Sequence, residues 1–265
     1  DCISQIHGIE MWSEDFYQML GEYISSAVKH GMTMLYTPLF TPALDTDVGH
    51  ERHTAQLIDI VKTKDGYVFG FDKLKKFIDF ALDNGIEYFE IAHLFTQWGG
   101  RACPKIVADV DGQIVKIFGW DNKADSPEYV EFLDALLPQL VDKLTEWGVA
   151  SKCYFHLTDE PNVNDIERYA KCREIVKKNI GNLPIMDALS NYEFHKQGLV
   201  DVPVVCIPHF KEFQDNDVKD LFAYYCCNPT DNYYCNRLLN MPLQRARIIG
   251  FALYKTRATG FLHWG

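Results

Sequence analysis

Residues 154–161 read YFHLTDEP and join a strand-like run to an Asp-Glu pair and a proline. Side chains of a strand alternate between its two faces, so the apolar Phe155 and Leu157 share one face. The opposite face carries Tyr154, His156 and Thr158. Proline cannot donate to a ladder, so the strand is expected to end before Pro161. The pattern predicts a buried strand with helices on its apolar side and polar groups at its carboxyl end.

Similar runs recur along the chain, where short β-rich stretches alternate with amphipathic helical stretches. Strand-like runs lie at residues 33–39, 86–95, 152–158, 183–189, 202–207, 221–226 and 260–264. Helical patterns cover residues 14–29, 71–84, 127–147, 164–179, 192–198 and 237–255. This alternation predicts βαβ units and a parallel sheet, which is either doubly wound or closed into a barrel.

We expect one α/β domain over residues 1–265, built as a TIM-like (β/α)8 barrel. No repeat, linker or charge block divides the chain. The first element is a helix and the last is a strand, so we expect the first strand and the last helix of the barrel to be missing. Residues 105–120 alternate as two arms around Asp111-Gly112, a dipeptide favoured in type I′ turns, which predicts a β-hairpin insertion.

The charge balance excludes several classes of partner. The chain has 26 Lys and Arg against 37 Asp and Glu, a formal net charge of -11. Such a surface repels nucleic-acid phosphates and anionic lipids, so no nucleic-acid partner is expected. No apolar run approaches the roughly 20 residues that cross a bilayer, so no membrane span is expected. The oligomeric state is left open.

Neither a metal nor a cofactor is predicted. The cysteines form no C-x-x-C pair and have no histidine at zinc-ligand spacing; most are expected to be reduced core residues, which favours a cytoplasmic location. The cluster Asp45, Asp47, His50, Glu51 and His53 fits no metal motif and is interpreted as a polar loop. The phosphate-binding glycine loops and the serine-hydrolase elbow are both absent from the sequence.

Asp159 and Glu160 are the candidates for catalysis. In (β/α)8 enzymes, catalytic side chains project from the carboxyl ends of the strands, where this pair is predicted to lie. The alternative interpretation is that Asp159 caps backbone amides of the turn and that Glu160 is solvated, as polar loop residues commonly are.

Two carboxylates suggest glycoside hydrolysis, in which an acid protonates the leaving oxygen and a second group stabilises the anomeric carbon. Consecutive side chains cannot easily flank a sugar at the separations that ordinary retaining or inverting pairs use. The pair therefore favours substrate-assisted catalysis, in which the 2-acetamido oxygen of the substrate attacks the anomeric carbon. Asp159 would orient the acetamido group, and Glu160 would act first as acid and then as base.

Side chains near other strand ends are candidates for sugar binding. The aromatic ones offer rings to a sugar, although buried aromatic residues more often pack in a core. The polar ones offer hydrogen bonds to hydroxyl groups, although a satisfied core histidine or a loop cap is the alternative. The candidates are Trp98, Tyr225, His263 and Trp264, together with His93, His156 and Asp187.

Five segments resemble glycoside hydrolase family 123: WSE at 12–14, LYTPLFTP at 35–42, QWGG at 97–100, HLTDEP at 156–161 and GFLHWG at 260–265. The resemblance implies a retaining β-N-acetylgalactosaminidase that works through an oxazoline-type intermediate. It implies that Asp159 positions the acetamido group and that Glu160 is the acid/base. It also implies that the sugar subsite is lined by His93, Trp98, Tyr225 and Trp264.

The resemblance makes a terminal β-linked N-acetylgalactosamine of a glycan or glycolipid headgroup the expected substrate. Members of the family carry a β-sandwich ahead of the barrel and further chain after it, which we expect to be missing here. A second hypothesis is a barrel glycosidase whose other carboxylate is Asp187, Asp45 or Asp231. A third is a sugar-binding barrel without catalytic activity.

Overall fold

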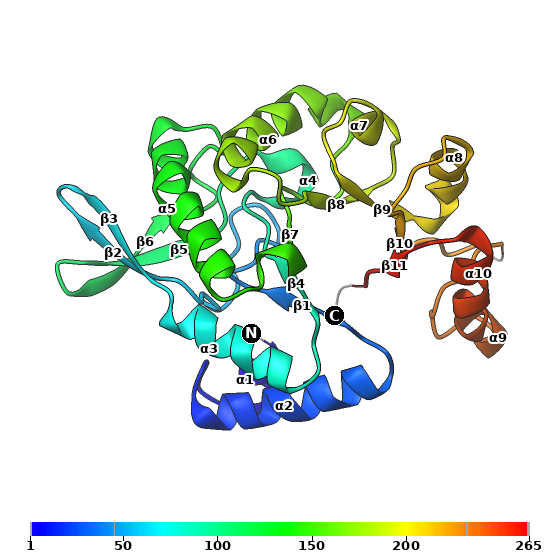
Figure 1. The fold of residues 1–265 in the computed structure, drawn as a ribbon, viewed down its shortest axis with the longest axis horizontal. Helices are drawn as coiled ribbons and strands as arrows, with labels where there is room; N and C mark the ends of the chain where they lie inside the picture. The colour runs from blue at the N-terminus through cyan, green and yellow to red at the C-terminus, as the bar shows by residue number, and fades with distance from the viewer. Residues whose placement is uncertain (1, 45, 232, 264–265) are drawn as a thin grey trace.

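The computed structural model describes residues 2–44, 46–231 and 233–263. Seven parallel strands follow one another around the molecule (Figure 1). They are β1 (Met34–Thr37), β4 (Tyr88–Ile91), β7 (Cys153–Phe155), β8 (Met186–Leu189), β9 (Val202–Cys206), β10 (Phe222–Tyr224) and β11 (Gly260–Phe261). Ladders join β1-β4-β7 and β8-β9-β10-β11, and a single parallel bridge between Phe155 and Ile185 links the two sets.

The α/β class is confirmed, because parallel strands alternate with helices along the chain. In the described part of the chain, however, no ladder joins β1 to β11. Closure of the predicted barrel is therefore not observed, and the barrel stays a prediction.

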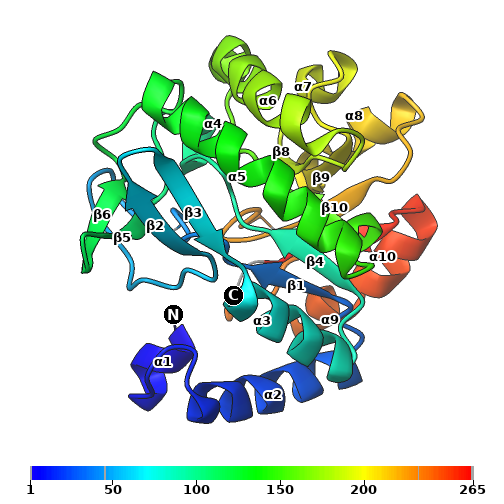
Figure 2. The same ribbon diagram turned by 60° about the vertical axis from the view of Figure 1, so that its left-hand side comes forward.

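Helices cover the outer side of the strands (Figures 1 and 2). The longer ones are α2 (Glu14–Lys29), α3 (Asp72–Asp83), α5 (Pro127–Glu146) and α6 (Ile166–Ile180). The shorter ones are α1 (Cys2–His7), α4 (Gln97–Gly100), α7 (Glu193–Lys196), α8 (Phe210–Asp215), α9 (Leu243–Arg247) and α10 (Ile249–Thr256). Within the described ranges, no helix is both long enough and apolar enough to cross a membrane.

The predicted first residue of a helix agrees with the structure for α2 and differs from it for the helix predicted over 237–255. Ser13 accepts a hydrogen bond from the Phe16 amide at 3.2 Å and begins α2 at the predicted residue. The helix predicted over 237–255 instead begins at Leu243 and divides into α9 and α10. Pro242 explains the late start, because a proline disfavours helical backbone in the residue before it.

Two apolar clusters lie on opposite faces of the strands. The larger one fills the space between strands and helices and includes Phe155, Leu157 and Val205. The smaller one gathers side chains of the other parity, among them Met186, Val204 and Tyr224, with Tyr154 packed against it. The alternation inferred for residues 154–158 is therefore present: the apolar pair faces the helices and Tyr154 faces the inner side.

The hairpin predicted at 105–120 is confirmed as β5 (Ile106–Val110) and β6 (Gln113–Phe118). Asp111 and Gly112 both have positive φ, 52° and 83°, as a type I′ turn requires. The sequence analysis missed a second hairpin, β2 (Asp59–Thr63) with β3 (Gly66–Gly70), although Asp65-Gly66 gives the same turn signal. Together they form a four-stranded sheet, β3-β2-β5-β6, on one side of the molecule (Figure 2).

Phe132 of α5 ties this sheet to the helical layer. Its ring lies 5.0 to 5.8 Å, centroid to centroid, from those of Phe40, Tyr67, Phe69 and Phe118.

We predict that Phe132→Ala lowers the free energy of unfolding by about 3–5 kcal/mol, because it leaves a cavity in a closely packed aromatic cluster. Urea unfolding followed by circular dichroism measures the loss. Val68→Ala on exposed β3 is the control and should cost less than about 1 kcal/mol; equal losses in the two variants would contradict the assignment.

Candidate active site

The chain turns sharply at the Asp159-Glu160 pair. Ladder pairing of β7 ends at Phe155, but the next residues stay beside β4, since the amides of Leu94 and Phe95 donate to the carbonyls of His156 and Leu157. Glu160 then takes a left-handed φ of 43°, which few non-glycine residues adopt. Asp159 is half-buried, whereas Glu160 is exposed. The hydroxyl of Tyr224, at the end of β10, donates a hydrogen bond to Glu160 Oε1.

Trp98 lies against this turn. Its amide donates to the Asp159 carbonyl at 2.7 Å, and its side chain is 48% exposed. Three consecutive residues, Trp98, Gly99 and Gly100, have positive φ. The glycines are required here, because a Cβ at Gly99 would lie 2.5 Å from Asp165 Cγ and one at Gly100 would lie 2.8 Å from Thr158 Cγ2. The WGG sequence thus fixes the backbone of an exposed tryptophan to the backbone of Asp159.

A buried network of charges lies directly below the pair. His156 Nε2 is 3.0 Å from Glu90 Oε1 of β4, and His156 Nδ1 is 2.9 Å from Asp187 Oδ1 of β8. Asp187 Oδ2 accepts hydrogen bonds from the Tyr169 hydroxyl and from the amides of Leu157 and Thr158 at 3.3 and 3.4 Å. These contacts join β4, the end of β7, β8 and α6 at one point.

This arrangement keeps His156 protonated. Burial alone would lower its pKa, but the charge of Glu90 and the hydrogen bond to Asp187 outweigh burial and raise the pKa to about 10. Burial raises the pKa of Asp187, opposed by its bonds to His156 and Tyr169. We assign His156 as a cation and Asp187 as an anion, because the Nδ1 to Oδ1 distance and two backbone donors favour the ion pair.

The pKa values of two neighbours of the cation are also shifted, that of His93 downwards and that of Asp159 upwards. His93, whose ring centroid is 4.4 Å from that of His156, has a pKa well below its usual value because it is buried and lies beside a positive charge. It is therefore neutral, with Nδ1 3.3 Å from the Tyr36 hydroxyl. Burial, with the charges of Glu160 and Asp187, raises the pKa of Asp159 to about 7.

A sequence comparison assigns the chain to a family. A model of the glycoside hydrolase 123 catalytic domain matches residues 1–265, the whole chain. The chain belongs to glycoside hydrolase family 123. This is a family of β-N-acetylgalactosaminidases.

Comparison with solved structures agrees with the fold. A family 123 glycoside hydrolase from Clostridium perfringens, described for glycolipid glycan hydrolysis, superposes with a TM-score of 0.72 at 14% sequence identity. The alignment covers 99% of this chain and 47% of that one, so the family 123 chain described here spans about half the length of its relative. The endoglucanase Cel5A of Pseudomonas stutzeri aligns at a TM-score of 0.35 and 12% identity, over 91% of this chain and 66% of that one, too weakly to support an argument. Among curated proteins, no sequence matches significantly.

Most of the residues singled out in the sequence gather at this site of the family 123 domain. Asp159, Glu160, Trp98, His156, Asp187 and His93 lie together. Tyr225 and His263 contact each other, with ring centroids 5.4 Å apart, and both rings also lie near that of Phe261. Trp264 lies outside the described residues. Roles for these three residues in sugar binding stay predictions.

Several contacting residues were not identified from the sequence. Tyr224 was not among the candidates, although strand alternation along β10 predicts that its side chain shares the inner face with Phe222, and it packs in the inner cluster. Glu90 could have been found as a single charge inside the apolar run YFEIAHLF at 88–95. No local signal marks Tyr36 or Tyr169, because their roles come from residues distant in the sequence.

Within the described residues, one group of donor atoms is close enough to hold a metal ion: His93, His156 and Asp187. Both ring nitrogens of His156 already face carboxylates, and the His156 proton competes with any metal for the same atoms. The donor set therefore fits a charge network better than a metal centre.

We predict that His156→Gln destabilises the domain by about 3–5 kcal/mol at neutral pH, because the buried Asp187 and the largely buried Glu90 lose their cation. The raised pKa means that the ion-pair stabilisation is complete below about pH 6.5 and is lost as the pH rises towards 10. The stability difference between wild type and variant should therefore shrink over this range, as measured by urea unfolding at several pH values. His30→Gln, at an exposed histidine, is the control. A difference that stays constant up to pH 10 would show that His156 is neutral.

Proposed function

We propose that this domain releases terminal β-linked N-acetylgalactosamine from glycans or glycolipid headgroups, by retaining, substrate-assisted catalysis on a TIM-like barrel. The observation that carries the proposal is the Asp159-Glu160 pair at a strand end, where the backbone of the exposed Trp98 is bonded to that of Asp159. Membership of family 123 and the glycolipid glycan activity of the Clostridium perfringens relative support the substrate class.

In the first step, the Asp159 carboxylate accepts a hydrogen bond from the acetamido N–H and holds the carbonyl oxygen near the anomeric carbon. That oxygen forms a bond to the anomeric carbon as the glycosidic bond breaks, and Glu160 gives its proton to the departing oxygen. The products of this step are the free aglycone alcohol, an oxazoline-type intermediate and the Glu160 carboxylate.

In the second step, the Glu160 carboxylate removes a proton from water, and the water oxygen attacks the anomeric carbon. The bond between the acetamido oxygen and the anomeric carbon breaks, which restores the acetamido group and the configuration of the sugar. The Tyr224 hydroxyl holds Glu160 Oε1 in place, while neutral His93 and Tyr36 offer hydrogen-bonding groups near the pair.

The hydrogen bonds of Asp187 argue against the second hypothesis, a glycosidase in which Asp187 acts on the substrate together with Glu160. Its side chain is fully buried, and both oxygens are occupied by His156, Tyr169 and two amides. Asp231, another alternative, accepts the amides of Tyr233 and Tyr234 within its own loop. Asp45, the remaining alternative, lies outside the described residues. Asp159 is half-buried and adjacent to Glu160, which favours it as the second carboxylate.

We predict that Glu160→Gln lowers kcat/KM for an aryl β-N-acetylgalactosaminide by roughly 100-fold to 10,000-fold, because a glutamine cannot transfer a proton. Glu193→Gln, at an ion-paired glutamate on α7, is the matched control and should leave the rate unchanged. The matching β-galactoside should not be hydrolysed, because it has no acetamido group. Equal turnover of the two sugars would reject substrate assistance, and no turnover by wild type would reject the enzyme activity.

We predict that kcat/KM for the acetamido substrate rises with pH through about 7, because Asp159 acts as an anion and its pKa is raised to about 7. Asp159→Asn should remove this acidic limb and lower the plateau by roughly 100-fold or more. Steady-state rates from pH 5 to 9 test this. An unchanged acidic limb in Asp159→Asn would assign it to another group.

A further inference from the structure

A cleft of about 630 Å³ opens beside Trp98. Trp98 and Gln97 line one side, and the loop between β1 and β2 lines the other with residues that include His50, Glu51 and Arg52. Neither the carboxylate pair nor the buried network lines this cleft. It therefore adjoins the catalytic residues through Trp98 and is a separate space.

The chemistry of the cleft suits a carbohydrate. Its volume lies within the roughly 300–1,000 Å³ of pockets that hold drug-sized ligands. Apart from the indole of Trp98, the lining side chains are amides, imidazoles, a hydroxyl, carboxylates and a guanidinium. Such groups bond to sugar hydroxyls, while an exposed indole offers an apolar face to a pyranose ring.

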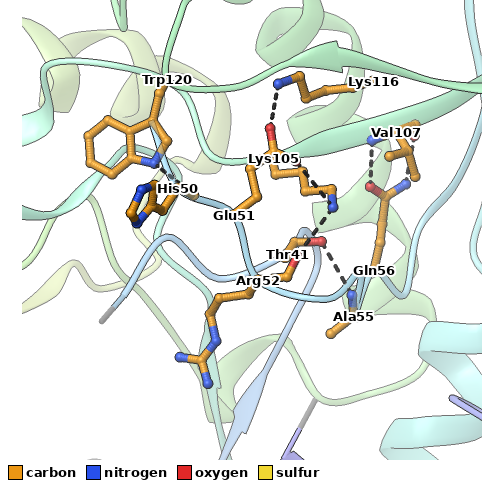
Figure 3. Close-up of polar contacts among 10 residues, drawn as sticks. All are labelled: Thr41, His50, Glu51, Arg52, Ala55, Gln56, Lys105, Val107, Lys116 and Trp120. Atoms are coloured by element: carbon orange, nitrogen blue, oxygen red, sulfur yellow. Dashed lines mark hydrogen bonds and ion pairs between the residues drawn. The ribbon is translucent and has the colours of Figure 1, made fainter. Parts of the chain in front are cut away.

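The loop that forms the second wall is fixed to the hairpin β5–β6 (Figure 3). The Thr41 amide donates to the Lys105 carbonyl at 3.3 Å, and the Thr41 hydroxyl accepts from the Ala55 amide at 3.2 Å. The Gln56 side chain bonds both the amide and the carbonyl of Val107, at 3.0 and 2.9 Å. Both ends of the loop are thus held by backbone groups.

Its central part is held by charges. Glu51 accepts a hydrogen bond from Lys116 and lies 3.4 Å from Lys105 Nζ, which also donates to the Arg52 carbonyl at 3.2 Å. The Trp120 indole donates to the His50 carbonyl at 3.1 Å. The hydrogen bond from Lys116 lowers the pKa of Glu51, which keeps this anchor ionised. In Figure 3 the Arg52 side chain points away from the hairpin.

The two walls are also joined to each other. Gln97 Nε2 donates to the Thr46 carbonyl at 2.7 Å, so the Trp98 segment and the loop keep a fixed separation. A site whose walls are held before the ligand arrives does not lose affinity to loop ordering.

We propose that this cleft binds the second and further sugars of the glycan, and that Glu51 is a positioning residue that holds the loop through Lys116 and Lys105. This inference rests on the proposed function and makes an oligosaccharide, rather than a small aglycone, the preferred substrate. A substitution of Lys116 tests the role of Glu51 in holding the loop, because Lys116 contacts Glu51 but does not line the cleft.

The experiment compares Kd for N-acetylgalactosamine and for a tetrasaccharide with that sugar β-linked at its end. Binding is measured by calorimetry in Glu160→Gln protein, so that no ligand is hydrolysed. We expect the tetrasaccharide to bind at least about tenfold more tightly than the monosaccharide. Adding Lys116→Met or Glu51→Gln should weaken the tetrasaccharide about threefold to tenfold and change monosaccharide Kd by less than about twofold.

Lys196→Met, at an exposed ion-paired lysine on α7, is the matched control and should change neither Kd. Equal Kd values for the two ligands, or equal weakening of both by Lys116→Met, would overturn the inference while leaving the proposed function intact. Failure of both ligands to bind, together with absence of hydrolysis by wild type, would overturn both. Thermal unfolding of each variant confirms that the comparison is made on folded protein.

Discussion

The buried cation of His156 holds the site together. The sheet ladders are interrupted between β7 and β8, where one bridge between Phe155 and Ile185 replaces a continuous pairing. His156 spans this interruption, because its two ring nitrogens face Glu90 on β4 and Asp187 on β8. Ion pairs deep in a protein gain little net stability, since both charges lose water, yet removing one partner is costly. The network therefore acts mainly to fix geometry where hydrogen-bond ladders do not.

That geometry reaches the Asp159-Glu160 pair through the backbone. Asp187 accepts the amides of Leu157 and Thr158, the residues that lead into Asp159. The backbone beyond is strained, since Trp98 and Glu160 both adopt left-handed conformations that cost on the order of 1–3 kcal/mol each. Such conformations persist only where surrounding contacts determine them, and here the Trp98 amide, the two glycines and the ordered strand end do so. The anchored strand end is thus a condition for the strained turn that presents the carboxylates.

Local patterns in the sequence were enough to predict the elements but not their long-range contacts. Alternation in YFHLTDEP identified the strand, its inner face and the carboxylates at its end, and Asp-Gly identified a hairpin turn. Proximity to a strand end selected Tyr225 as a candidate, and the structure adds its neighbour Tyr224, which bonds Glu160. The helix predicted before Pro242 was wrong because apolar periodicity outweighed the proline in that interpretation. Contacts such as Glu51 with Lys116, separated by 65 residues, carry no local signal and depend on how the two hairpins pack.

The proposed catalytic groups and the proposed sugar-binding cleft lie on different parts of the fold. The groups proposed to act on the sugar lie at the ends of parallel strands, where the buried network restricts any change. The cleft beside Trp98 is formed instead by a loop and stabilised by a hairpin sheet that adds no strand to the parallel set. Changes in this loop alter the ligand-facing wall without disturbing His156 or its two carboxylates. Trp98 belongs to both regions, because its amide bonds the Asp159 carbonyl and its side chain lines the cleft, and the close packing of Gly99 and Gly100 fixes the backbone that follows it.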